Sequence, residues 1–86
     1  MIKRFKVNGH SMEPAFYDGD NLIFSSLFFN LNEGDVIVFN SDGRDYLKRI
    51  KKAAGNQLVV SGDNKSHSRT FNISSNKIKG KLLMKY

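Results

Sequence analysis

Short apolar runs separated by turn-forming residues most restrict how this chain folds. The runs are four to six residues long, and no helical period is sustained beyond about ten residues. Short runs of this kind are typical of strands, so the pattern predicts an all-β protein. The expected strands are 3–7, 21–24, 35–40, 45–52, 57–60 and 77–85, with a polar connection over 64–75.

Dipeptides of Gly with Asp or Asn mark the expected turns. Residues 41–44, Ser-Asp-Gly-Arg, lie between two apolar runs, and Asp-Gly tolerates the positive φ angles of a tight hairpin. Residues 54–56, Ala-Gly-Asn, predict a second turn. Gly-Asp at 19–20 and at 34–35 each precedes an apolar run, and turn chemistry explains this recurrence without an internal duplication.

The length of 86 residues suits one domain, residues 1–86, with one modest core. An apolar fraction of 40% with 26% charged residues indicates a globular chain. The absence of Cys excludes disulfides, thiol catalysis and thiolate zinc sites. Two His residues without Cys make no convincing metal site, so no metal or cofactor is expected.

A net charge of +6 would attract nucleic acid or anionic lipid. The basic residues alternate with apolar ones as on strands, however, and no helix with a basic face is expected. We therefore expect mostly solvated lysines, with nucleic-acid binding as an alternative that steep salt dependence would reveal.

The expected location of the chain follows from its apolar segments. Residues 1–6 are basic but lack the apolar core of a signal peptide. The most apolar stretch, 22–31, is interrupted by polar residues and falls well short of the ~20 residues that span a bilayer. We therefore expect a chain that is not membrane-anchored by itself, and the absence of Cys fits a cytoplasmic location. Within this stretch, Phe28 and Phe29 beside Leu27 would either close the core or form an exposed apolar lip.

Two residues suggest chemistry. Ser11 lies in Gly-His-Ser-Met-Glu-Pro, residues 9–14, and Lys48 follows inside an apolar strand. A serine hydroxyl is a poor nucleophile until a base removes its proton, and a neutral lysine can be that base. The neighbouring His10 competes poorly with Lys48 for this role and is expected at the rim of the site.

Lysine is charged in water at neutral pH, with an ordinary pKa of about 10.4, so a lysine base needs burial. Strand alternation places Lys48 on one face with Tyr46 and Ile50, and puts Leu47 and Arg49 on the other. This apolar face, closed by Met12, would disfavour the charged form.

The backbone around Ser11 also fits a nucleophile. Gly9 permits an unusual φ or a close approach of substrate, and Pro14 stiffens the chain just after the serine. We expect the Ser11 backbone N–H to be one donor to a developing oxyanion, whereas the sequence identifies no second donor.

Four segments together resemble the LexA-like and type I signal peptidase superfamily of serine–lysine peptidases. They are residues 9–14, Asp-Gly-Asp at 18–20, Gly-Asp-Val-Ile-Val at 34–38 and Leu-Lys-Arg-Ile at 47–50, and the likeness runs from about residue 7 to 83. The resemblance implies a small coiled β-sandwich or half-open barrel of the LexA C-terminal domain type. It also implies that Ser11 attacks the peptide carbonyl and that Lys48 is the general base.

Two branches of this superfamily compete. Residues 48–52, Lys-Arg-Ile-Lys-Lys, and Gly9 look like the self-cleaving LexA-like branch. Residues 62–69 look like a shortened signal peptidase box. That second likeness implies that Ser66 or Ser68 orients the lysine and that Asp63 with Arg69 braces the site.

The resemblance implies a serine endopeptidase that cleaves an extended peptide with small residues near the scissile bond. Few residues precede Ser11, and Ala-Gly at 54–55 is interpreted as a turn, so we expect the substrate to be a separate chain. The alternative is a catalytically silent dimerisation or regulatory module of a LexA-like repressor system, partnering a separate DNA-binding chain as in an SOS response. An open edge on the C-terminal strand, residues 81–86, would then pair with a second copy.

Overall fold

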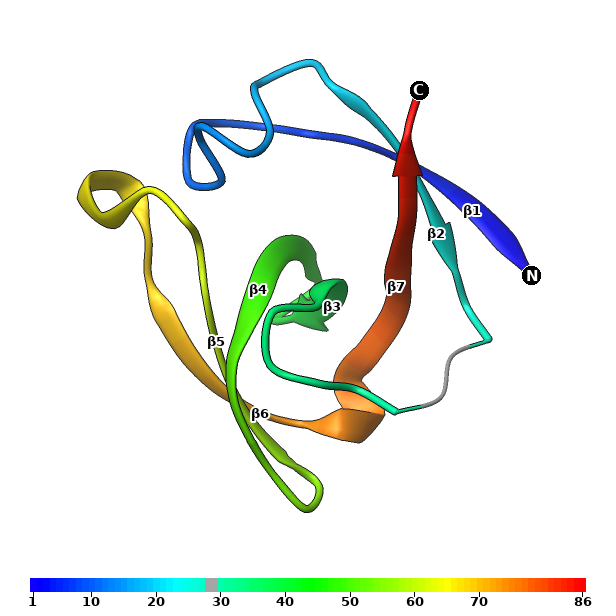
Figure 1. Cartoon of the computed structure of the whole chain (residues 1–86), viewed down its shortest axis with the longest axis vertical. Coiled ribbons are helices and arrows are strands. Elements are labelled where there is room, and N and C mark those ends of the chain that lie inside the picture. Colours follow the sequence, from blue (N-terminus) through cyan, green and yellow to red (C-terminus); the bar gives the residue numbers. More distant parts are fainter. Residues whose placement is uncertain (28–29) are drawn as a thin grey trace.

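A single antiparallel sheet forms the molecule (Figure 1). The computed structural model describes residues 1–27 and 30–86, so Phe28 and Phe29 lie outside the described residues. The strands are β1 (Ile2–Lys6), β2 (Asn21–Ser25), β3 (Val36–Ser41), β4 (Arg44–Ala54), β5 (Gln57–Ser61), β6 (Thr70–Ser74) and β7 (Ile78–Lys85). Their order in the sheet is β1-β2-β7-β3-β4-β5-β6. The all-β prediction is confirmed, since the only helical elements among the described residues are two 3₁₀ turns, η1 (Lys65–His67) and η2 (Ser75–Lys77).

All six expected strands are present, but one strand was missed. The expected polar connection over 64–75 contains β6, which pairs along the whole of β5. Only Phe71 and Ile73 are apolar in β6, so the run is too polar and too short to be recognised alone. Pairing with β5 makes it a strand, because Ile73 lies opposite Leu58 and contributes to the core.

The predicted hairpin between β3 and β4 is confirmed. Asp42 and Gly43 both have positive φ angles, 53° and 78°, as a two-residue turn with the twist of a hairpin requires. The turn between β4 and β5 likewise contains Gly55 at a φ of 61°, so the Ala-Gly pair at 54–55 lies in a turn as expected.

The core consists of two clusters on opposite faces of β3. Val36 and Val38 point into the first cluster, whereas Ile37 and Phe39 point into the second, so β3 is buried on both faces. The sheet therefore curves around both core clusters, with β3 between them. The first cluster contains Val7, Met12, Leu22, Phe24, Val36, Val38 and Leu47. The second contains Ile37, Phe39, Ile50, Leu58, Val60, Ile73 and Ile78.

The C-terminal strand β7 lies inside the sheet, between β2 and β3, and has one open side over its second half. Within β7, Ile78, Gly80 and Lys81 pair with β3, while the strand pairs with β2 as far as Lys85. The two edges of the sheet are β1 and β6. Hence β7 joins the two halves of the sheet, and only its last residues, beyond Lys81, have a strand partner on one side alone.

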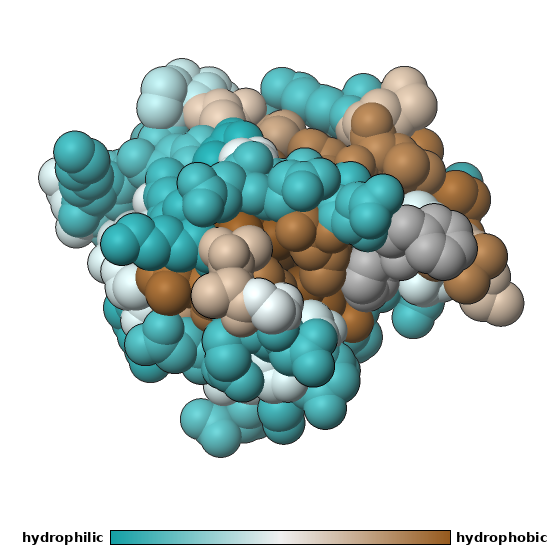
Figure 2. Space-filling view, turned by 60° about the horizontal axis from the view of Figure 1, so that its bottom comes forward, coloured by the Kyte–Doolittle hydropathy of each residue, from teal (hydrophilic) through white to brown (hydrophobic). Residues whose placement is uncertain are grey.

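The face shown in Figure 2 is largely polar, with apolar residues gathered toward one side and in a recess near its centre. In the described ranges, no helix has the length and apolar character needed to cross a bilayer.

Candidate active site

The loop between β1 and β2 carries Ser11 and is closed at its base by backbone hydrogen bonds. Val7 N–H donates to the carbonyl of Asp20 at 2.9 Å, and Gly19 N–H donates to the carbonyl of Val7 at 2.8 Å. The turn before the serine is held by Asp18, whose Oδ1 accepts from Gly9 N–H at 2.7 Å. Gly9 has a φ of 89°, where a side chain would be strained, so the local geometry accounts for glycine at this position.

Lys48 lies on β4 and its side chain reaches the serine. The Lys48 Nζ is 3.2 Å from Ser11 Oγ. Lys48 is 5% exposed and is the one charged residue buried in the described chain. Its burial lowers the pKa of its ammonium below the ordinary value of 10.5, and the positive charge of Arg69 lowers that pKa further. The arrangement thus favours a neutral amine in contact with a serine hydroxyl.

The apolar surroundings differ in one respect from those expected. Tyr46 packs against the second core cluster, which contains Ile50, in keeping with the face predicted for Lys48. Met12 belongs instead to the first cluster, together with Leu47. At 1% exposure, Met12 anchors the serine loop to this first cluster.

The segment after β5 approaches the serine loop closely, as the yellow and blue loops show in Figure 1. Asn64 N–H donates to the carbonyl of Ser11 at 2.8 Å. Gly62 is buried, and a Cβ added there would lie 2.3 Å from the Ser11 carbonyl oxygen. The contact therefore requires glycine at position 62, because any side chain would push the two segments apart.

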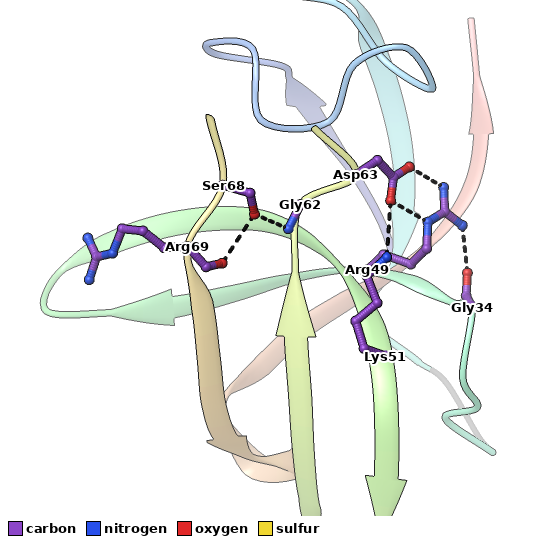
Figure 3. A network of polar contacts seen from close by, with 7 residues as sticks. All are labelled: Gly34, Arg49, Lys51, Gly62, Asp63, Ser68 and Arg69. Carbon is purple, nitrogen blue, oxygen red and sulfur yellow. Dashed lines mark hydrogen bonds and ion pairs between the residues drawn. The ribbon is translucent and has the colours of Figure 1, made fainter. Parts of the chain in front are cut away.

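An ion pair fixes this segment to the lysine strand (Figure 3). Asp63 accepts two hydrogen bonds from Arg49, 2.8 Å from Nε and 2.9 Å from Nη2. Arg49 also donates from Nη1 to the carbonyl of Gly34 at 2.7 Å, and Lys51 Nζ lies 3.8 Å from Asp63. The structure brings Asp63 together with Arg49 but does not bring it together with Arg69, the other residue expected to brace the site. The guanidinium of Arg69 points away from Asp63 and lies 4.8 Å from the centre of the Phe71 ring.

Neither candidate orienting serine hydrogen-bonds to Lys48 in the described structure. Ser68 Oγ accepts from Gly62 N–H at 2.5 Å and donates to the carbonyl of Arg69 at 3.3 Å, so it supports the segment that touches Ser11. Ser66 is exposed in η1, and its backbone N–H donates to Asn64 Oδ1 at 3.2 Å.

Replacing Arg49 by Met should destabilise the domain by about 1–2 kcal/mol, because Asp63 would lose a bidentate, partly buried partner. The matched control is Lys79→Met, which breaks the more exposed Lys79–Asp45 pair and should cost under about 1 kcal/mol. Urea unfolding of the three proteins measures both values. Equal midpoints for the two variants would contradict a structural role for the Arg49–Asp63 pair.

An open groove of about 580 Å³ passes over Ser11 and Lys48. Its lining combines apolar, polar and charged groups, contributed by Phe5, residues 7–12, residues 44–48 and His67. His10 is exposed, and its Nδ1 lies 2.5 Å from Glu13 Oε2, whose hydrogen bond and negative charge raise the His10 pKa. His10 thus lines the groove, as expected, with one ring nitrogen engaged by Glu13. No group of three or more His, Asp or Glu side chains suited to a metal ion occurs within 1–27 and 30–86.

Sequence reasoning missed two contributors to this geometry. Arg49 was assigned to the face opposite Lys48 but not to Asp63, although its charge in a half-buried strand signalled a need for a partner. Asn64 lies within the segment 62–69, and nothing in its position along the chain indicates contact with residues 10–11.

Comparison with known families agrees with this geometry. The model of the Peptidase S24-like family matches residues 3–83. No curated protein sequence matches the chain. The matched region contains all seven strands apart from a few terminal residues, and both Ser11 and Lys48. The chain therefore belongs to the Peptidase S24-like family.

Proposed function

We propose that this domain is a serine endopeptidase in which Ser11 is the nucleophile and Lys48 the general base. The observation that carries the proposal is the 3.2 Å contact between Lys48 Nζ and Ser11 Oγ. Lys48 is buried, and this burial lowers the pKa of its ammonium. A lowered pKa favours the neutral amine, which is the form that accepts a proton.

The reaction needs only these two side chains and the backbone. Ser11 Oγ attacks the peptide carbonyl while its proton passes to Lys48 Nζ. The negative charge that develops on the carbonyl oxygen is stabilised by the Ser11 backbone N–H. Lys48 then gives its proton to the leaving amine, and the carbon–nitrogen bond breaks. Water, deprotonated by the same lysine, hydrolyses the acyl-enzyme and restores Ser11.

The proposed substrate is an extended segment of a separate chain. The groove is open and lies beside the serine, so an extended peptide can enter without a change of fold. Small residues near the scissile bond are part of the proposal because the family resemblance implies them.

Exposure of the domain to a peptide mixture tests the activity. We expect new peptide termini with the wild type, detected by mass spectrometry, and none with Ser11→Ala. The matched control Ser41→Ala lies in the β3–β4 hairpin and should cleave like the wild type. The rate should rise with pH through the Lys48 pKa and level off below 10.5, because only the neutral amine is a base. Equal cleavage by wild type and Ser11→Ala would exclude the proposed nucleophile.

A second candidate function is a dimerisation module. Leu83, Met84 and Tyr86 near the C-terminus are each 54% exposed, which is high for apolar side chains beside a sheet. Under this alternative, sedimentation would show a dimer that Met84→Lys dissociates. A monomer at all concentrations would exclude it.

A further inference from the structure

Asn64 forms hydrogen bonds with the peptide carbonyls on both sides of the nucleophile. Its side-chain Nδ2 donates to the carbonyl of His10 at 2.9 Å, and its backbone N–H donates to the carbonyl of Ser11 at 2.8 Å. The orientation of the amide is fixed as well, because Oδ1 accepts from Ser66 N–H at 3.2 Å. One residue thus holds the carbonyl before Ser11 and the carbonyl after it.

The carbonyl of His10 and the N–H of Ser11 belong to the same peptide group. Glu13-Pro14 is the one cis bond in the described chain, so the bond between His10 and Ser11 is trans. In a trans peptide the N–H and the C=O point in opposite directions. A donor that fixes the His10 carbonyl on one side therefore aims the Ser11 N–H to the other.

The Ser11 N–H is suited to act on a ligand. In the part of the chain that the structure describes, this N–H has no hydrogen-bond partner. By contrast, the nearby Gly9 N–H already donates to Asp18 and is therefore occupied. Ser11 itself lines the groove.

We propose that Asn64 is a positioning residue for the oxyanion donor: by holding the His10 carbonyl, its side chain aims the Ser11 N–H at the substrate's carbonyl oxygen. A hydrogen bond to the carbonyl also polarises the peptide group and strengthens its N–H as a donor. The inference deepens the proposed function and rests on it, and Asn64 itself touches neither the substrate nor the reacting atoms.

Two substitutions of Asn64 test whether its Nδ2 donor, rather than its side chain as a whole, positions Ser11. Asn64→Asp keeps an oxygen for Ser66 N–H but places a second oxygen against the His10 carbonyl, whereas Asn64→Ala removes both groups. Because an oxyanion donor acts mainly in the transition state, kcat should fall about 10–100-fold in both variants while KM changes less than about threefold. The exposed Asn76 supplies the control, and Asn76→Asp should leave kcat and KM unchanged. A wild-type kcat for Asn64→Asp would overturn the proposal.

A second measurement does not depend on activity. The residual dipolar coupling of the Ser11 N–H bond reports its direction, and this coupling should change in Asn64→Ala while those of the central strand β3 stay the same. An unchanged Ser11 coupling would overturn the role of Asn64 even if the wild type cleaves peptides. Conversely, a changed coupling in a protein without peptidase activity would support the positioning role and reject the proposed function.

Discussion

Replacing Lys48 by Met should abolish peptide cleavage and leave the fold intact. Met nearly matches the lysine stem in length and apolar character, so the buried site keeps its packing while Ser11 loses its proposed base. Loss of a general base costs about a thousandfold in rate. Initial rates on any peptide that the wild type cleaves measure the effect, and a variant retaining a tenth of the wild-type rate would show that Lys48 is not the base.

The same substitution should change how stability depends on pH. Burial lowers the folded-state pKa of Lys48 below its unfolded value, so between these two values the unfolded chain binds more protons. Wild-type stability therefore rises with pH from the folded-state pKa toward 10.5, and Lys48→Met lacks this rise. At neutral pH the variant should be equally stable or more stable, by about 1 kcal/mol, because no ammonium is buried. Lys52→Met, at an exposed position of β4, should keep the wild-type pH profile.

Gly62→Ala should be the most damaging change of a single methyl group. The added Cβ would lie 2.3 Å from the Ser11 carbonyl oxygen and 2.8 Å from Ser68 Oγ, and the first of these atoms is backbone that cannot rotate away. The two segments must separate, which would cost about 2–3 kcal/mol and displace the serine from Lys48. Thermal unfolding and the rate of peptide cleavage measure the two losses.

Gly80→Ala provides the comparison for this prediction. A Cβ at position 80 would come within 3.1 Å of Phe24 Cβ and 3.2 Å of the Ser25 carbonyl, so a small adjustment relieves it. We therefore expect a smaller loss of stability and continued peptide cleavage. If Gly80→Ala lowered stability more than Gly62→Ala, the close approach of Gly62 to Ser11 would not be the reason that position 62 requires glycine.

The sequence predicted those parts of the site that depend on local pattern. Alternation placed Lys48 among apolar neighbours, and Asp-Gly located the hairpin that brings β3 and β4 together. Pairings between distant segments have no such local signal. Arg69 lies close to Asp63 along the chain, but its guanidinium lies over the Phe71 ring. The arginine that binds Asp63 is Arg49, which only the fold places beside it. The strand Thr70–Ser74 was not predicted for the same reason, because its pairing with β5, and not its own composition, stabilises the extended conformation.

The order of strands has a consequence for when the proposed peptidase site can assemble during synthesis of the chain. The loop that bears Ser11 belongs to the half of the sheet built from β1 and β2, whereas Lys48 belongs to the half that begins with β3. Within the sheet these halves are joined through β7, the last of the seven strands along the chain. A growing chain therefore contains both reactive residues long before it can hold them together. Under the proposed function, peptide cleavage should therefore begin only after β7 has paired with both β2 and β3.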